Sequence, residues 1–228
     1  VPSVGDFVQQ EPDEGELATE QTEVWVWFDD ENVYVAARCW HSEPDRIVAN
    51  EMKRDSYNMF GNEIFAVVID TFYDRRSAYN FVTNALGALF DAAITNERTP
   101  NLDWNTVWDV RTEYFDGGWT VEFVIPFRSL RYPAGAGRSW GINLGRTVLS
   151  KNERSFLTRI PASLSSRGFT TAAYAGNLVG LEVPDDSINI DVKPYAIGGL
   201  TSDLSMPNPI KNQLSGDAGV DLKYKITQ

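Results

Sequence analysis

The sequence predicts an all-β protein, namely an antiparallel β-sandwich of the jelly-roll or immunoglobulin-like type with a C-terminal extension of barrel-like strands. Three observations predict this class. Apolar and polar residues alternate with a period of two from Val24 to Val183, which is the side-chain period of a strand. The alternating runs recur about every ten residues with turn-forming residues between them, as a sandwich requires. No segment shows a helical period over three turns, so little helix is expected.

Composition and charge limit the class of function. The chain has 228 residues, of which 43% are hydrophobic and 12% aromatic, so it can bury a sizeable core in one large β-domain, with or without an appendage. The net charge of -12 argues against nucleic-acid binding, because phosphate recognition needs clustered Lys and Arg. Cys39 is the only cysteine, so no internal disulfide is expected. No apolar run of about 18 residues predicts a membrane-spanning helix, no signal peptide is recognised, and a start at Val1 fits a processed or trimmed chain.

The first 22 residues are expected to form a polar N-terminal arm. They include the acidic stretch QQEPDEGELATEQTE, which offers little apolar surface for burial. A hairpin follows. Apolar residues alternate with tryptophans in residues 24–28, and a second alternating run covers residues 33–37. The polar residues 29–32 between the two runs form the turn.

Further strands are expected at regular intervals along the rest of the domain. Residues 64–70 are apolar almost throughout, which suggests that both faces of this strand are covered. The polar residues 72–76 then form a loop. Asp116-Gly117-Gly118 forms a tight turn, because glycine reaches positive φ without steric cost. The complete set of further strands is 64–70, 77–84, 89–94, 106–115, 119–127, 141–149 and 178–183.

The character of the chain changes after Pro184. Apolar residues alternate with polar ones around 188–192 and again in 220–226, and the intervening residues 201–217 are rich in turn formers. Two such strands cannot form a domain alone and the chain ends inside the second, so the natural protein is expected to continue. Apolar-out and polar-in alternation is also typical of transmembrane barrel strands. The expected domains are an arm at 1–22, the sandwich at 23–184, and a linker with the first barrel-like strands at 185–228.

The order and spacing of several motifs resemble a known family, the family 9 carbohydrate-binding modules, which are antiparallel β-sandwiches. The motifs that carry the resemblance are FDDENVYVAARC, FAVVIDTFYDRR, NFVTNALGALFDA, WNTVWDVRTEYFDGGWTVEFVIPFRSLRY and WGINLGRTV. The likeness covers residues 23–183, and it is greater to a bacterial family in which such a module precedes a predicted outer-membrane β-barrel. The resemblance implies a secreted glycan-binding module at the bacterial cell envelope, on the periplasmic or extracellular face of the outer membrane. It also implies a covalently linked downstream membrane barrel.

The resemblance further implies a binding site. Family 9 modules hold the end of a glycan between two aromatic rings, with a carboxylate, an arginine and amides on the hydroxyl groups. This arrangement suits a sugar, which has an apolar C–H face and a polar edge. The rings correspond to Phe60 and Phe169, and one amide corresponds to Asn84. The carboxylate and the arginine correspond to Ala66 and Val82, whose side chains form no hydrogen bonds.

Three polar residues are candidates to replace the missing carboxylate and arginine. They are Arg76, Glu63 and Asn80, each under a strand register that differs from the correspondence just given. The polar half of the expected site therefore depends on the register. The expected ligand-binding residues are Phe60, Phe169, Asn84 and Arg76.

The seven tryptophans raise a separate question. Trp25 and Trp27 lie two residues apart in one strand, so their side chains share a face that is either a packing surface or a sugar-stacking platform. Large aromatic residues dominate sandwich cores, which favours packing against neighbouring protein. The same structural interpretation applies to Trp104, Trp108, Trp119 and Trp140.

A structural calcium ion is another expectation from the resemblance. Asp29, Asp30 and Glu31 cluster in the first hairpin turn, and calcium is bound by carboxylate and carbonyl oxygens in loops. A solvated turn is the alternative for the same residues. Zinc is not supported, because one cysteine and one histidine do not build a typical zinc site.

No catalytic residue is predicted. His41 is the only histidine and follows a strand end, and no spacing of Asp and Glu singles out a glycosidase pair. The preferred function is therefore non-catalytic glycan binding. One alternative is a structural or gating module of an outer-membrane barrel that has lost sugar binding, and Ala66 and Val82 favour it. The other is part of a glycoside hydrolase that acts in carbohydrate catabolism.

Overall fold

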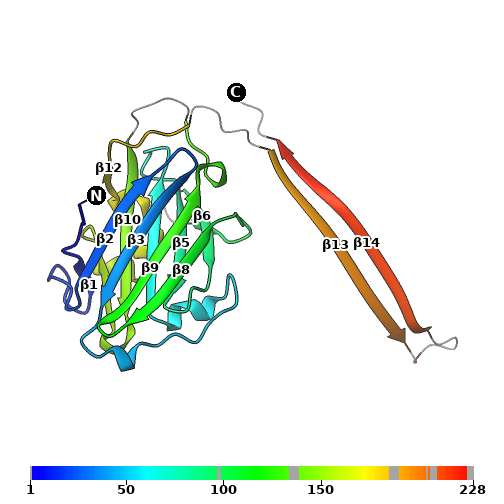
Figure 1. The fold of residues 1–228 in the computed structure, drawn as a ribbon, viewed down its shortest axis with the longest axis horizontal. Helices are drawn as coiled ribbons and strands as arrows, with labels where there is room; N and C mark the ends of the chain where they lie inside the picture. The colour runs from blue at the N-terminus through cyan, green and yellow to red at the C-terminus, as the bar shows by residue number, and fades with distance from the viewer. Residues whose placement is uncertain are drawn as a thin grey trace. The chain divides into compact units, whose positions relative to one another are not determined.

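The structure is a computed structural model that describes residues 2–96, 99–133, 139–184, 190–203, 205 and 210–224. The chain divides into two compact units, Val1–Asp186 and Ser187–Gln228. The first is a β-sandwich and the second is a two-stranded hairpin (Figure 1). Each unit is described by itself.

Four strands form the smaller sheet of the sandwich and pair antiparallel in the order β2-β3-β9-β8. β2 and β3 make the predicted first hairpin. β8 and β9 are joined by the predicted tight turn, where Gly118 has a φ of 145° and a Cβ would clash with the carbonyl oxygen of Cys39. The strands are β2 (Thr22–Phe28), β3 (Asn32–Trp40), β8 (Asp109–Phe115) and β9 (Gly118–Pro126).

Eight strands form the larger sheet, and all their pairings are antiparallel. Seven of them follow the order β1-β11-β10-β4-β5-β6-β7, and β12 pairs with one end of β10. The strands are β1 (Val8–Glu11), β4 (Ile64–Asp70), β5 (Ala78–Asn84), β6 (Phe90–Thr95), β7 (Thr99–Asn101), β10 (Trp140–Val148), β11 (Glu153–Phe156) and β12 (Gly176–Leu178).

Short 3-10 helices connect the strands, and three of them cover the outer face of the larger sheet. Met59 of η2 and Phe169 of η5 pack in one apolar cluster with Ala66 of β4 and Val82 of β5. Ala172 of η6 packs in a smaller cluster on neighbouring strands. The helices are η1 (Pro44–Arg46), η2 (Tyr57–Gly61), η3 (Phe127–Ser129), η4 (Leu149–Lys151), η5 (Ala162–Thr170) and η6 (Ala172–Tyr174). Within the residues that the structure describes, no helix has the length and apolar character needed to cross a membrane.

The main hydrophobic core lies between the two sheets. Alternate residues of β3 and β9 point into it, as the period-two pattern predicts. The structural interpretation of four tryptophans is confirmed, because Trp108, Trp119 and Trp140 are buried in this core and Trp104 packs against it. Trp108 stacks on Phe123 with ring centroids 5.7 Å apart.

The expectation of a polar arm in residues 1–22 is wrong. β1 pairs with β11 at the edge of the larger sheet. Phe7 is buried in the main core, where its ring centroid lies 6.5 Å from that of Phe65. The polar composition hides this role, because buried polar side chains here have partners: the Gln9 amide donates to the carbonyl oxygen of Leu17 at 2.8 Å.

Two elements near the C-terminal end of the sandwich also differ from the prediction. No strand covers residues 179–184, since β12 ends at Leu178. Leu181 and Val183 are nevertheless buried in the core, so their apolar spacing reflects burial rather than strand pairing. β11 was not predicted because half of its residues are charged, although Glu153 is buried and accepts hydrogen bonds from Thr19. The other predicted strands of the sandwich are present within a few residues of their expected ends.

The second unit contains β13 (Ile190–Asp203) and β14 (Ile210–Tyr224), which pair antiparallel along almost their whole length. The expectation of a loop over residues 201–217 is wrong, because the Leu200–Leu214 pair extends the ladder into that segment. One face of the hairpin carries the exposed apolar residues Val192, Leu200, Leu214 and Val220. The predicted strand residues 188 and 226 lie outside the described residues.

Candidate functional site

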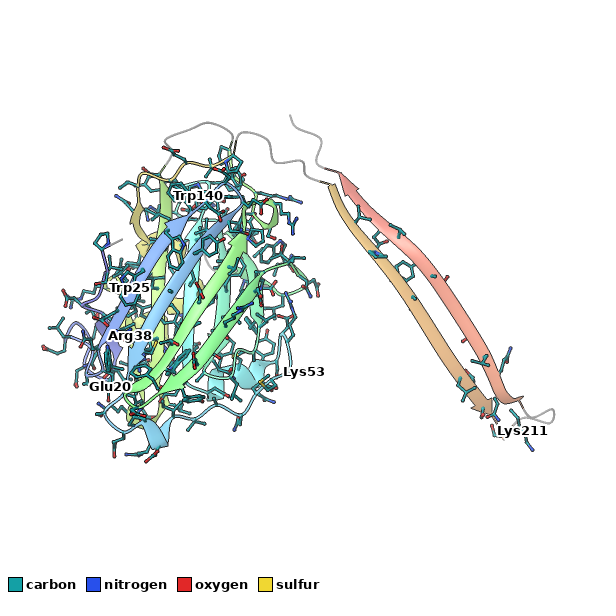
Figure 2. All side chains as sticks on the ribbon, viewed as in Figure 1. Glu20, Trp25, Arg38, Lys53, Trp140 and Lys211 are labelled. Carbon is teal, nitrogen blue, oxygen red and sulfur yellow. The ribbon has the colours of Figure 1, made fainter. Side chains whose placement is uncertain are left out.

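The outer face of the four-stranded sheet, which we call the open face, carries the outward-pointing half of each strand. In β3, for example, Val35 and Ala37 are buried in the core, whereas Ala36 and Arg38 point outward. The outward residues combine aromatic rings with charged side chains (Figure 2). They include Glu23, Trp25 and Trp27 of β2, Tyr34, Ala36, Arg38 and Trp40 of β3, Thr120 and Glu122 of β9, and Arg111 and Glu113 of β8.

Antiparallel pairing arranges these residues in rows that cross the sheet. Directly opposite residues in such a sheet have Cβ atoms about 5 Å apart, so the members of a row are neighbours. Arg111 therefore lies next to Glu122, and a cation of β8 faces an anion of β9. The first row is Trp25, Ala36, Glu122 and Arg111, and the second is Glu23, Arg38, Thr120 and Glu113.

Arg38 lies between two indole rings on this face. Its guanidinium carbon is 5.9 Å from the ring centroid of Trp25 and 5.6 Å from that of Trp40, which is the range of cation–π contacts. The Glu23 carboxylate lies 3.6 Å from Arg38 Nη1 and accepts a hydrogen bond from Trp40 Nε1 at 3.2 Å. One carboxylate thus contacts both the arginine and one ring.

A groove crosses the open face beside this cluster. Its floor includes the small residues Ala36 and Thr120, which lie between longer side chains of the neighbouring strands. The groove has a volume of about 660 Å³, and a second hollow of about 390 Å³ continues it toward Trp40. Arg38 and Glu113 line both hollows. The larger volume falls in the usual range of small-ligand sites.

The groove spans the width of the sheet. Its lining begins at Trp25 on the edge strand β2 and ends at Arg111 and Glu113 on the edge strand β8. Leu86 and Gly87 of the β5–β6 turn also line it. The charged side chains that line the larger hollow are two arginines and two glutamates, so cations and anions balance there; they are Arg38, Arg111, Glu113 and Glu122.

Trp25 and Trp27, which are predicted to pack against neighbouring protein, lie outside the core within the described residues. Both side chains are half-buried on the open face and belong to none of the buried clusters. Trp27 stacks on Tyr34 instead, with ring centroids 5.2 Å apart and an interplanar angle of 6°. The apolar half of β2 fills the core, which leaves the tryptophan half outside.

The turn at Asp29, Asp30 and Glu31 does not fit the calcium expectation. Asp29 Oδ1 accepts the backbone N–H of Glu31 at 2.8 Å and of Asn32 at 2.7 Å, and Oδ2 accepts the Tyr34 hydroxyl at 2.7 Å. The Glu31 N–H, then the Tyr34 hydroxyl, hold the pKa of Asp29 below its usual value. Across the described ranges, no three His, Cys, Asp or Glu side chains are grouped to hold a metal ion. The carboxylate of Asp29 stabilises the turn itself.

The aromatic position expected at Phe169 is inside the protein. The Phe169 side chain is 3% exposed, and its ring centroid lies 4.9 Å from that of Phe156. A Cβ on Gly145 would approach both rings to 2.7 Å, so a glycine is needed beneath them. Ala66 and Val82 are cross-strand partners in the same apolar cluster. Phe169 therefore has no open ring face for a sugar.

The other residues expected at this site lie in three different settings. Phe60 is 37% exposed and packs edge-to-face on Phe90, with ring centroids 5.1 Å apart. Asn84 is buried, and its amide nitrogen donates to the Glu51 carbonyl at 2.7 Å while its oxygen accepts two backbone N–H groups. Arg76 is exposed on the β4–β5 loop. The four residues do not form one open cleft.

A buried polar pair joins the two sheets at one end, and no sequence pattern predicts it. His41, just after β3, has Nε2 3.3 Å from Glu63 Oε1 and 3.2 Å from Ser150 Oγ, and its Nδ1 accepts the Glu43 N–H at 2.9 Å. Burial raises the pKa of Glu63 to about 7 and lowers the pKa of His41. Neither side chain reaches solvent, so this pair has no access to a substrate.

Comparison with known proteins identifies the fold. No family model and no curated protein sequence matches the chain. A family 9 carbohydrate-binding module from Caldicellulosiruptor kristjanssonii in complex with cellotriose superposes with a TM-score of 0.52 at 13% identity, over 82% of this chain and 85% of that chain. The glucose complex of such a module from the same organism gives 0.54 at 13% identity, over 82% and 86%. A candidate carbohydrate-binding protein from Bacteroides uniformis gives 0.61 at 12% identity, over 78% and 86%.

The sandwich therefore has the fold of the family 9 carbohydrate-binding modules. The open face with its groove is not the face that the resemblance implied. Arg38, Arg111, Glu113 and Glu122 were missed because charged residues at alternate strand positions are usual on any solvated sheet. The available signal was the pairing of such charges with Trp25 on the same outward half of four strands.

Proposed function

We propose that the sandwich is a non-catalytic glycan-binding module whose ligand lies in the groove of the open face. The observation that carries this proposal is the cluster of Trp25, Arg38 and Trp40 beside a groove with a floor of small residues. A sugar has an apolar C–H face that suits an indole and a hydroxyl edge that suits guanidinium and carboxylate groups. The groove offers both kinds of group within one surface.

The fold supports this assignment. The superposed modules from Caldicellulosiruptor kristjanssonii bind cellotriose and glucose, and binding modules need no activated nucleophile or base. The only histidine of this chain is buried beside Glu63, away from the groove lining. These features support a role in holding a glycan.

A titration with sugars tests the proposal. The 228-residue chain is titrated calorimetrically with neutral mono- and oligosaccharides, and binding by at least one of them is expected. Trp25→Ala should weaken this binding at least tenfold, whereas Phe60→Ala, which truncates an exposed ring on the other face, should leave it within twofold. A folded protein that is silent across the panel contradicts the proposal. Release of shorter sugars during incubation would instead show a glycoside hydrolase.

We also propose that the module belongs to a protein of the bacterial cell envelope, with the hairpin as the start of an outer-membrane barrel. The apolar face of the hairpin supports this, because Leu200 and Leu214 are 65% and 82% exposed and form a cross-strand pair. The opposite face carries polar residues such as Thr201 and Ser215 together with the exposed Tyr195 and Ile197. An isolated two-stranded hairpin is at best marginally stable in water, so further strands and lipid would stabilise it.

Site-specific labelling tests the hairpin proposal. Leu214→Cys and Ser215→Cys are each labelled with an environment-sensitive fluorophore and mixed with phosphatidylcholine vesicles. Native Cys39 should stay unlabelled, because it is buried and burial raises its thiol pKa to about 11. A blue shift at position 214 and none at 215 is expected. Equal spectra at both positions would contradict entry of one face into lipid.

A structural or gating module that has lost sugar binding is the second candidate function. The specific observation that favours it is the burial of Phe169 with Ala66 and Val82, which fills the position where the resemblance implies a ligand. The two candidates differ in the sugar titration, since a gating module predicts silence for the wild type and for all variants.

A further inference from the structure

We infer that the groove takes an internal stretch of a neutral glycan chain, at least three sugar rings long, rather than a single terminal sugar or an acidic chain. This inference rests on the proposed function of the open face. It adds the class of ligand and the residues that select it.

The groove is longer than a single sugar ring. Its lining runs from Trp25 on β2, across β3 and β9, to Arg111 on β8, so it spans three strand-to-strand spacings. At about 4.8 Å for each spacing, this is about 14 Å. A pyranose ring is roughly as wide as one spacing, so a single sugar would leave most of the lining without contact.

The indole rings of the open face are not arranged as a clamp for one sugar. A clamp of two aromatic rings on a terminal sugar, as the resemblance implies, needs open space between the rings. On the open face, the space between Trp25 and Trp40 is filled by the Arg38 guanidinium, which lies within 6 Å of both ring centroids. Trp27 likewise has one ring face against Tyr34. Each indole can therefore stack only one side against a ligand that lies along the surface.

The charges that line the groove favour a neutral ligand. Two arginines and two glutamates line the larger hollow, and Arg38 and Arg111 each have a carboxylate beside them, from Glu23 and Glu122. An acidic sugar would need an arginine without such a carboxylate, and the net charge of -12 would also repel a polyanion. Alternating donors and acceptors suit the uncharged hydroxyl groups of a neutral chain.

Arg111 and Glu122 are assigned to the hydroxyl edge of the chain. They lie opposite each other in one row with Ala36, at the β8 side of the groove floor, with Trp25 at the far end of the same row. A chain that stacks on Trp25 and follows this row reaches the arginine and the glutamate with its next rings. Both side chains are exposed, so they are available to a ligand.

The experiment measures affinity as a function of chain length and charge. Linear neutral gluco-, xylo- and manno-oligosaccharides of one to six units and oligogalacturonates are titrated into the 228-residue chain. The dissociation constant of the best neutral series should fall at least tenfold between the disaccharide and the tetrasaccharide. Oligogalacturonates should bind at least tenfold more weakly than that series. Arg111→Ala and Glu122→Ala should each weaken tetrasaccharide binding about tenfold, and Glu122→Gln, which keeps one carbonyl acceptor, should recover part of it.

Each other result has a distinct meaning. Monosaccharide binding as tight as tetrasaccharide binding overturns the chain-internal inference but leaves the proposed function standing. Tighter oligogalacturonate binding overturns the neutral class alone. Loss of binding in Phe60→Ala, with none in Trp25→Ala, places the ligand on the other face and overturns the inference. Dimerisation that Trp25→Ala abolishes would show a second copy in the groove, and silence across the panel overturns the proposed function as well.

Discussion

The outward faces of the two sheets are built from strands of the same geometry but differ in how far their residues are buried. On the larger sheet, every residue of β4 and β5 is buried, because η2, η5 and η6 cover the outer side while the main core covers the inner side. On the smaller sheet, the residues of β3 alternate between buried and accessible. One sheet thus has two cores, and the other has one core and one open face.

This difference shows how a covered sheet face loses the capacity to bind a ligand. Once Phe169 packs over Gly145 and Ala66, any polar group at these positions would have to be buried without a partner, at a cost of about 1–3 kcal/mol or more. The residues beneath Phe169 are apolar because η5 covers them. Charged and aromatic side chains that a ligand can reach lie instead on the open face of the smaller sheet, where the groove is.

The largest expected effect separates the two faces by stability. Phe169→Ala removes a buried ring from the covered face and should lower the free energy of unfolding by about 3–5 kcal/mol. Trp25→Ala truncates a half-buried ring on the open face and should lower it by about 1 kcal/mol or less. Urea unfolding followed by tryptophan fluorescence and circular dichroism measures both, with circular dichroism as the probe that does not depend on Trp25.

The reverse order of effects would break the comparison. If Phe169→Ala leaves stability unchanged and abolishes sugar binding, the ring serves a ligand and the covered face is the site. If Trp25→Ala is the more destabilising change, then the open face is part of the packed structure of the protein.

The sequence predicted the sandwich and most strand positions because burial and strand period leave a direct record in residues such as 24–28 and 64–70. It also indicated that both faces of 64–70 are covered, which the structure confirms. It could not reveal that Phe169 supplies the cover, because 3-10 segments carry no simple period and contacts between residues about a hundred positions apart leave no local pattern. The role of Phe7 was hidden in the same way by its polar neighbours.

The candidate site was less predictable than the fold. Trp25 and Trp27 are evident in the sequence, but strand alternation alone does not tell which half of β2 faces the core. That choice depends on the smaller apolar side chains of the same strand, such as Val24, which fit between the sheets. The neighbours of Arg38 come from two strands and became evident only with the register.

The second largest expected effect concerns the seam between the two sheets, by which we mean the buried pair of His41 and Glu63. Glu63 precedes β4 of the larger sheet and His41 follows β3 of the smaller one. The folded-state pKa of Glu63 is about 7, above the ordinary value of 4.5, so the folded state binds this proton more tightly than the unfolded state. The stability that Glu63 contributes is therefore complete below about pH 4.5 and is lost as the pH rises toward 7, by about 3 kcal/mol.

Comparison with Glu63→Gln isolates this effect. The lowered pKa of His41 acts in the opposite direction, since burying a neutral imidazole favours higher pH, and it is present in both proteins. The variant should be more stable than the wild type at about pH 8 and lose this advantage at about pH 5. Urea unfolding across this range measures the difference. Parallel stability curves would show that Glu63 is already ionised in the folded state across this range.

The third effect tests whether polar residues of the covered face are structural. Asn84→Ala removes hydrogen bonds to the carbonyl oxygen of Glu51 and from the N–H groups of Leu86 and Ala88, which leaves buried groups unpaired. The expected loss is about 1–3 kcal/mol of unfolding free energy, with sugar affinity unchanged at temperatures where the protein is folded. Arg76→Ala is the matched control and should change neither quantity by much, because Arg76 is exposed and does not line the groove. A loss of sugar affinity in either variant would indicate that the ligand binds on the outer side of the larger sheet.

The smallest expected effect is no effect at all, and it concerns the turn beside the open face. Calcium at a hundred times its dissociation constant would stabilise a folded protein by about 2.7 kcal/mol and raise its melting temperature measurably. Millimolar calcium should leave the melting temperature of this protein unchanged, because both carboxylate oxygens of Asp29 already accept hydrogen bonds within the turn. Differential scanning calorimetry with calcium and with a chelator measures this, with magnesium as the control for ionic strength. A calcium-specific rise that Asp29→Asn removes would show that the turn opens to take the ion, and the hydrogen bonds from Glu31, Asn32 and Tyr34 would then describe only its metal-free form.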